Sequence, residues 1–107
     1  MVRAAALAVG LLAMSGVAQA DPAPERQREL IHQLRHDCGS CHGMTLKGGL
    51  GPALLPAALA ERPDDFLQDV ILSGVPGKPM PPWRFEISES EAAWLVRQLK
   101  RGVGDGG

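Results

Sequence analysis

Two cysteines and one histidine fall within five consecutive residues, Cys38-Gly39-Ser40-Cys41-His42. Two thiols three positions apart on one helical turn can each bond a vinyl-derived carbon on the same edge of a porphyrin. The adjacent imidazole then lies close enough to bind iron at the ring centre. The spacing therefore predicts one covalently attached haem c, bound through Cys38 and Cys41, with His42 as an axial iron ligand.

Three other uses of the cysteine pair stay open at this point. An exported protein can join two cysteines in a disulfide, a thioredoxin-like redox pair has the same spacing, and zinc binds both cysteine and histidine. The sequence shows no βαβ pattern, which a thioredoxin-like pair would require. It also has no second pair of ligands at a customary spacing, which a zinc site would require. Haem attachment is favoured because an export signal and helical patterns accompany the motif.

A second axial ligand has to come from another sulfur or imidazole. Outside residues 1–20, the candidates are Met44, Met80, His32 and His36. Met44 follows His42 by two residues, which span at most ~7 Å, too little for ligands on opposite faces of the ring. The two other histidines lie on the helix that delivers Cys38, so they begin on the wrong side, and their i, i+4 spacing is more typical of a solvated face.

Met80 lies far along the chain, in a proline-rich loop that has to fold around something. Pro79, Pro81 and Pro82 fix their own φ angles and restrict the residues before them, so Met80 is held extended. A stiff segment loses less entropy on ordering and presents the thioether repeatably. Met80 is therefore predicted as the second axial ligand rather than a core filler, and a His/Met pair raises the reduction potential.

Weaker candidates could support these ligands. An iron-bound histidine normally donates its other N–H to a carbonyl group, and the carbonyl of Pro52 in the Gly51-Pro52 loop could accept it. Trp83 and Trp94 could pack against the ring or donate an indole N–H to a propionate. Plain burial in the core explains each tryptophan equally well.

Hydrophobic periodicity predicts the first helix, which has to position the motif. From Glu25, apolar residues recur at every fourth position (Leu30, Leu34, Cys38), which indicates a helix with one apolar face. This helix is expected to start breaking down at Gly39. Residues 43–53 contain four glycines and a proline and should form an irregular loop. A short helical piece is expected within residues 54–60.

Two further helices are predicted. The first should have Pro63 in its first turn, an apolar stripe at residues 66, 67, 70 and 71, and its end at Gly74. Residues 74–82, with four prolines, cannot form regular structure. The last helix should begin with a capping box formed by Ser88 and Glu91 and end at Gly102.

The first twenty residues differ from the rest. Arg3, an apolar run and Ala18-Gln19-Ala20 predict a signal peptide cleaved after residue 20; the run is shorter than the ~20 residues that span a bilayer, and an uncleaved anchor is the alternative. Residues 21–107 remain as one mono-haem domain in the periplasm, with 102–107 as a flexible tail.

The chain's net charge of −1 and its lack of basic clusters argue against nucleic acid or a membrane surface as partner.

The motif at 38–42, Gly51-Pro52 and Pro79-Met80-Pro81, between amphipathic terminal helices, resembles the class I c-type cytochromes over roughly residues 25–101. The resemblance implies an all-α class I cytochrome c fold, with three or four helices and long loops around one haem. It also implies that the terminal helices cross, that the carbonyl of Pro52 holds His42, that Met80 is the distal ligand, and that one haem edge is exposed.

Within that family, the run from Asp37 to Met44 and the segment from Lys78 to Trp83 resemble the small cytochromes of denitrification gene clusters, the NirC or cytochrome c-55X type. That resemblance implies an electron donor to a haem-d1 nitrite reductase, or a role in maturing its d1 haem.

The predicted function is periplasmic transfer of single electrons, without catalysis, because the sequence offers no nucleophile–base pair or carboxylate dyad. Redox partners would dock transiently near the haem edge, where Lys47 and Lys78 could steer an acidic partner. Two alternatives stay open: a maturation factor for a d1-type reductase, and a ligand-binding haem protein with a weak Met80 bond.

Overall fold

The computed structural model describes residues 21–103 and, separately, Gly10. Apart from Gly10, the predicted signal peptide lies outside the described residues, as do residues 104–107 of the predicted tail. Between residues 21 and 103 the chain forms helices and loops, with no strand. No helix in this range is long and apolar enough to cross a membrane.

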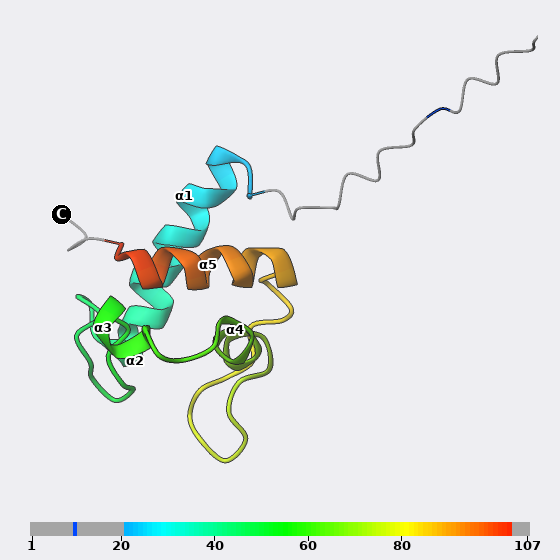
Figure 1. Ribbon diagram of the computed structural model, residues 1–107. Helices are drawn as coiled ribbons and strands as arrows, with labels where there is room; N and C mark the ends of the chain where they lie inside the picture. The colour runs from blue at the N-terminus through cyan, green and yellow to red at the C-terminus, as the bar shows by residue number, and fades with distance from the viewer. Residues whose placement is uncertain (1–9, 11–20, 104–107) are drawn as a thin grey trace, which may run out of the picture.

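The prediction of three or four helices with long loops is confirmed (Figure 1). The first helical stretch is continuous and consists of α1 (Pro24–Gln33), the π-helical segment η1 (Leu34–Cys38) and α2 (Gly39–His42). The short α3 (Pro56–Leu59) lies within the predicted range 54–60. The two remaining helices are α4 (Asp64–Ser73) and α5 (Glu89–Arg101).

The expectation that the first helix begins to end at Gly39 is wrong. Gly39 is buried and has helical dihedral angles, φ −61° and ψ −26°, and its N–H bonds to the carbonyl of Leu34, five residues back. The helix ends only at Gly43, whose φ of 93° lies in the left-handed region. A glycine inside a helix costs about 1 kcal/mol relative to alanine, and a Cβ at this position would meet Met44 at ordinary contact distances of 3.5 and 3.6 Å.

The predicted signals at the ends of α4 and α5 are confirmed at Gly74, Ser88 and Gly102, but not at Pro63. Pro63 has an extended ψ of 143° and directly precedes α4 instead of lying in its first turn. At α5, the backbone N–H of Glu91 donates to Ser88 Oγ at 3.2 Å, and the Ser88 N–H donates to Glu91 Oε1 at 2.9 Å. These two bonds are the predicted capping box, and α5 ends at Gly102 as predicted.

The terminal helices cross, as the family resemblance implies (Figure 1), and α5 packs on α1, α3 and α4. Their buried faces form the core, to which Leu30 and Leu34 contribute from the first stretch and Leu95 and Leu99 from α5. An ion pair ties the crossing together, because Arg26 Nε of α1 donates to Glu91 Oε2 of α5 at 2.5 Å. Because α1, η1 and α2 are continuous, the crossing of α1 with α5 also positions the motif at the end of this helical stretch.

Candidate haem site

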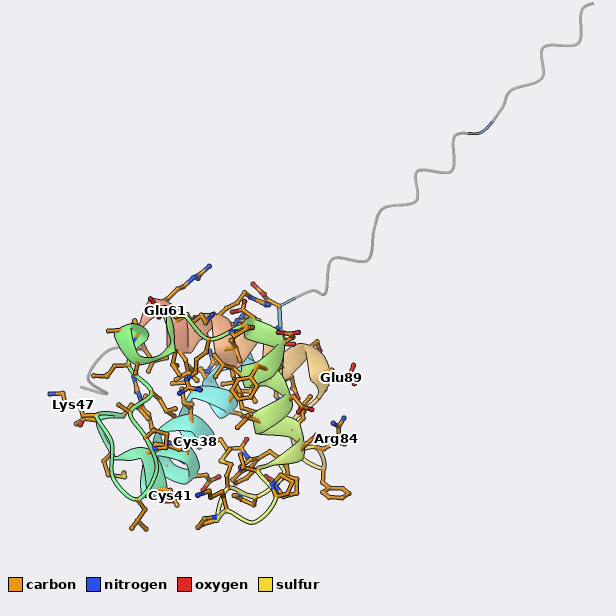
Figure 2. All side chains as sticks on the ribbon, turned by 60° about the horizontal axis from the view of Figure 1, so that its bottom comes forward. Cys38, Cys41, Lys47, Glu61, Arg84 and Glu89 are labelled. Carbon is orange, nitrogen blue, oxygen red and sulfur yellow. The ribbon has the colours of Figure 1, made fainter. Side chains whose placement is uncertain are left out.

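The two cysteines of the motif differ in exposure. Cys38 is half-buried and lies toward the interior, whereas Cys41 is exposed at the edge of the molecule (Figure 2). Burial, assisted by the negative charge of Asp37, raises the pKa of the Cys38 thiol to about 11. The Cys38 thiol is therefore uncharged at neutral pH, as suits a group that faces an apolar cavity. The two sulfur atoms are not bonded to each other.

A glycine-rich loop closes the carboxyl end of α2. The N–H groups of Gly48 and Gly51 donate to the carbonyls of His42 and Cys41 at 2.9 and 2.7 Å. These two bonds satisfy carbonyls that the end of a helix leaves unpaired. The approach depends on missing side chains, because a Cβ on Gly43 would lie 2.6 Å from the carbonyl oxygen of Gly48. The loop predicted over residues 43–53 thus holds the carboxyl end of the motif in place.

The same loop orients the imidazole of His42. Its Nδ1 lies 2.7 Å from the carbonyl oxygen of Pro52. Since a carbonyl only accepts, the geometry requires the proton on Nδ1 and leaves Nε2 with a free lone pair. Gly51 lies against the ring, and a Cβ there would be 2.7 Å from His42 Cε1. The imidazole therefore sits in a cradle that any larger residue at position 51 would fill.

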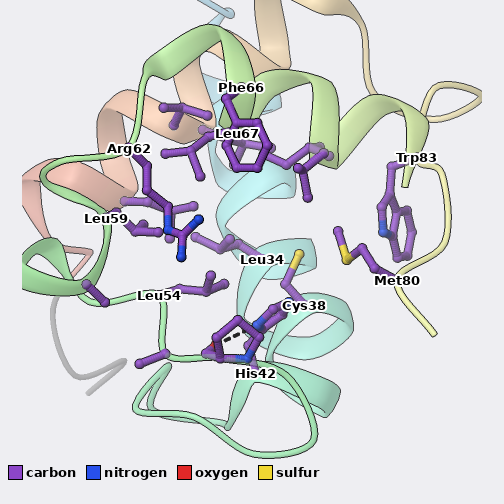
Figure 3. A pocket seen from close by; sticks show the side chains of 18 of the residues that line it. Leu34, Cys38, His42, Leu54, Leu59, Arg62, Phe66, Leu67, Met80 and Trp83 are labelled. Carbon is purple, nitrogen blue, oxygen red and sulfur yellow. Dashed lines mark hydrogen bonds between the residues drawn. The ribbon is translucent and has the colours of Figure 1, made fainter. Parts of the chain in front are cut away.

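His42 and Cys38 line a cavity of about 360 Å³ whose walls are mostly apolar (Figure 3). The stripe predicted for α4 forms one wall and α5 forms another, and the lining residues of these two helices are Phe66, Leu67, Val70, Ile71, Leu95, Val96 and Leu99. Met80 and Trp83 enter from the segment that follows α4. The structure thus brings one thiol, one imidazole and one thioether to a single apolar space.

The segment that carries Met80, residues 75–83, is called the methionine strap below. It begins with a turn in which the Lys78 N–H donates to the Val75 carbonyl at 3.1 Å. The two arms of the strap are joined to each other, because the Val75 N–H donates to Met80 O at 3.1 Å. The second arm is also attached to α4, because the Trp83 N–H donates to Ile71 O at 3.0 Å. Trp83 is half-buried beside Met80 (Figure 3).

Other candidates from the sequence lie elsewhere. His32 and His36 are exposed, with ring centroids 4.1 Å apart, and line a separate hollow together with Trp94. Trp94 is buried there and does not line the cavity, so the interpretation that it packs against the ring or bonds a propionate is wrong. Met44 is 61% exposed, which agrees with its rejection as a ligand.

Sequence reasoning missed Arg62, the only lysine, arginine or carboxylate side chain among the residues that line the cavity. Figure 3 shows its guanidinium directed into the cavity between Leu59 and Phe66. It precedes Pro63 in a loop, and no periodic pattern assigns a direction to a loop side chain. A cation at this position would complement an anionic group on the rim of a ligand.

These residues fit a haem on structural grounds. The walls are apolar, the Nε2 lone pair of His42 is free, and the Gly51 cradle sets the ring orientation. The zinc alternative finds no support in the described part of the chain, because no three histidine, cysteine or acidic side chains gather there. When bound, a haem supplies one-electron chemistry at its iron, while the protein supplies ligands, orientation and an apolar surround.

Comparison with known proteins shows the family to which the chain belongs. The family described as "Cytochrome C oxidase, cbb3-type, subunit III", a family of c-type cytochrome domains, matches residues 23–97. The chain is 49% identical over 89 residues to cytochrome c55X of Pseudomonas aeruginosa, covering 83% of this chain and 75% of that protein. It is 48% identical over 96 residues to cytochrome c55X of Paracoccus denitrificans, covering 89% of this chain and 93% of the relative.

Solved structures agree with the sequence relatives. One described as "c-type cytochrome NirC" superimposes with a TM-score of 0.75 at 50% identity, over 77% of this chain and 96% of that chain. The chain belongs to the c-type cytochromes, in the family whose members are named cytochrome c55X and NirC. It is therefore an electron-transfer protein rather than an enzyme, and membership of the family implies covalently bound haem c.

A more distant likeness connects the chain to a larger protein. It is 37% identical over 93 residues to dihydro-heme d1 dehydrogenase of Pseudomonas aeruginosa, which covers 87% of this chain but only 18% of that protein. A solved structure described as "Dihydro-heme d1 dehydrogenase NirN in complex with DHE" matches with a TM-score of 0.60 at 33% identity, over 65% of this chain. This chain thus corresponds to a small part of that dehydrogenase.

Proposed function

We propose that this chain is a periplasmic cytochrome with one haem, which carries single electrons to a haem-d1 nitrite reductase. The observation that carries the proposal is that Cys38, His42 and Met80 line one apolar cavity although Met80 is distant from the other two in sequence. Residues 1–20 would be removed as a signal peptide, and residues 21–107 would form the mature domain, with 102–107 as its tail.

In this proposal each site residue has a separate role. Cys38 and Cys41 attach the haem covalently, and His42 binds iron through Nε2 while Nδ1 donates to the carbonyl of Pro52. Met80 is the second axial ligand, presented by the methionine strap, and Trp83 packs beside it. A neutral thioether and an apolar surround both favour ferrous over ferric iron, so these ligands suit a carrier with a raised reduction potential.

Exposed groups in and next to the segments that carry the site residues suit brief contact with a redox partner. Leu50, in the loop that follows the motif, is 94% exposed, and Phe85, just after the methionine strap, is 93% exposed. Lys47, in the same loop as Leu50, and Lys78, in the methionine strap, are also exposed, and Lys47 points outward in Figure 2. Apolar groups beside lysines favour a small docking patch that an acidic partner approaches quickly and leaves quickly.

A second candidate function follows from the likeness to dihydro-heme d1 dehydrogenase. A dehydrogenase has to pass on the electrons that it removes, and this chain resembles a part of that protein. In this second reading the chain acts during maturation of the d1 haem. It could accept electrons released when the macrocycle is oxidised. The carrier reading is preferred because the relatives covered over most of their length are named cytochromes.

Rapid mixing tests the proposed function. The periplasmically matured protein is reduced and then mixed with haem-d1 nitrite reductase and nitrite, and the ferrous absorbance is followed. With nitrite present we expect the oxidation of many equivalents of carrier per reductase. Without nitrite the oxidation should stop at the few equivalents that the haems of the reductase can hold, and without the reductase there should be none. A carrier that stays ferrous while small-molecule donors sustain the same reductase would refute the proposal.

A deletion strain separates the two candidates. If the reductase from that strain contains d1 haem and works with external donors, the protein acts as a carrier. A reductase that lacks d1 haem would instead support the maturation role. A third reading, a ligand-binding haem protein with a weak Met80 bond, predicts tight carbon monoxide binding by the wild-type ferrous protein, whereas the proposed carrier binds it weakly.

A further inference from the structure

Gly74 lies at the junction between α4 and the methionine strap. It is buried, its φ is 69° and its ψ is −169°, and its N–H donates to the Val70 carbonyl at 3.0 Å. This combination of dihedral angles belongs to a region of the Ramachandran map that is essentially restricted to glycine. The backbone alone therefore requires glycine at this position.

The surroundings of Gly74 add a second requirement, which concerns Met80. A Cβ built on Gly74 would lie 2.6 Å from the carbonyl oxygen of Met80 and 2.8 Å from main-chain atoms of Pro81 and Pro82. All three neighbours are backbone atoms, and two belong to prolines, so no side-chain rotation can relieve the overlap. The strap's backbone thus rests directly on the α-carbon of Gly74.

Hydrogen bonds on both sides of this contact hold the strap against it. The Val75 N–H, next to Gly74, donates to Met80 O at 3.1 Å, and the Trp83 N–H donates to Ile71 O at 3.0 Å. The Arg84 N–H also donates to Leu72 O at 3.2 Å. These bonds fix the backbone at Met80 and after it, and Gly74 contacts the stretch from Met80 to Pro82 that lies between them.

We propose that Gly74 is a positioning residue that sets how far the Met80 thioether reaches into the cavity. The inference rests on the proposed function, in which Met80 is the second axial ligand. A methyl group at position 74 displaces the Met80 carbonyl away from α4 and carries the Met80 side chain with it. The sulfur then binds iron less well, and external ligands compete with it more easily.

Gly77 offers a matched control within the same strap. Its φ is 77°, so a substitution there also meets the strain of a positive φ, but no atom lies within 4 Å of its ideal Cβ. It is the third residue of the turn from Val75 to Lys78, where a glycine with positive φ is customary. Gly77→Ala therefore tests backbone strain in the strap without a clash against Met80.

The experiment measures imidazole binding to the ferric, periplasmically matured protein and compares wild type with Gly74→Ala, Gly77→Ala and Met80→Ala. We expect Gly74→Ala to lower the imidazole dissociation constant at least about tenfold, and Gly77→Ala to stay within about threefold of wild type. Equal constants for Gly74→Ala and wild type, or equal shifts in both glycine variants, would overturn the positioning role. Met80→Ala reports on the proposed function separately, because an unchanged constant there shows that Met80 is not the ligand.

A second variant keeps the test valid if Gly74→Ala does not fold. Val75→Pro removes the N–H that holds Met80 O and adds no atom to Gly74, and residue 75 already precedes Pro76, which favours the extended conformation that proline adopts. We expect this variant to lower the imidazole dissociation constant by about three- to tenfold, with unchanged helix content by far-ultraviolet circular dichroism. A wild-type constant in folded Val75→Pro would contradict the proposal.

Discussion

The imidazole Nδ1 of His42 lies 2.7 Å from the carbonyl oxygen of Pro52, and the residue before that proline, Gly51, packs against the same ring. A main-chain carbonyl and an absent side chain thus determine the orientation of the predicted iron ligand. Neither feature depends on the proline ring itself. The two positions should therefore respond differently to the same substitution.

Gly51→Ala is expected to disturb the site much more than Pro52→Ala. The new Cβ would lie 2.7 Å from His42 Cε1, and overpacking of this kind lowers the free energy of unfolding by about 1–3 kcal/mol. Pro52→Ala keeps the carbonyl and should lower the free energy of unfolding by less than about 1 kcal/mol. Denaturant unfolding of the two haem-loaded variants measures both costs, and similar losses in the two would contradict the account of His42.

The Arg26–Glu91 pair is expected to make stability depend on pH. The hydrogen bond from Arg26 lowers the pKa of the Glu91 carboxyl below its usual range. A lowered folded-state pKa contributes stability that is fully present above the unfolded value, near ~4.3, and is lost as the pH falls through the folded value. Glu91→Gln keeps a capping-box acceptor and should cost about 1–2 kcal/mol at pH 7.

Glu29 provides the control for that prediction, because it pairs with the same Arg26 at 2.9 Å but is 64% exposed. Glu29→Gln should change the free energy of unfolding by less than about 0.5 kcal/mol. Urea unfolding between pH 7 and pH 2 checks both variants. A Glu91→Gln deficit that stays constant down to pH 2 would show that the pair is not its cause.

Lysines near the site are expected to affect the rate at which partners associate. Reversing the charge at Lys47 or Lys78 should slow oxidation by the nitrite reductase about three- to tenfold at low ionic strength, and the difference should shrink in high salt. Arg28→Glu, in the separate hollow with His32 and His36, is the matched control and should have little effect. Equal slowing by all three substitutions would point to net charge instead of a local docking patch.

Removing the predicted sulfur ligand should lower the reduction potential and open the iron. Met80→Ala is expected to bind carbon monoxide in the ferrous state at least about tenfold more tightly than wild type, which corresponds to ~1.4 kcal/mol of lost competition. Met44→Ala should behave like wild type, because Met44 is an exposed methionine near the motif. Potentiometric and carbon monoxide titrations measure both effects, and an unchanged potential in Met80→Ala would mean that the ligand lies elsewhere.

Local signals predicted much of the fold because they act over a few residues. The capping box of Ser88 and Glu91 appears as two hydrogen bonds, 3.2 and 2.9 Å long. The apolar stripe of α4 lines the cavity as its spacing indicates. In both cases the sequence pattern and the structural feature span a single helix, so no distant contact has to be known.

Features that depend on distant contacts could not be predicted in the same way. The π-helical segment before Gly39 and the continuation through Gly39 depend on packing in the folded state, which outweighs glycine's poor helix propensity. The position of Trp94 outside the cavity could not be predicted either. Residues 92–96 of α5 are all buried, so the hydrophobic periodicity does not indicate which of them face the cavity. The contact of Gly74 with Met80 joins two segments whose approach no local pattern encodes.

The most direct test of the central claim is the absorption spectrum of the ferric, periplasmically matured protein in the region of the weak sulfur-to-iron charge-transfer band. The account predicts that wild type and Met44→Ala show the band and that Met80→Ala lacks it. Covalent haem without the band in wild type, or a band that survives in Met80→Ala, would contradict the assignment of His42 and Met80 as the iron ligands of an electron carrier.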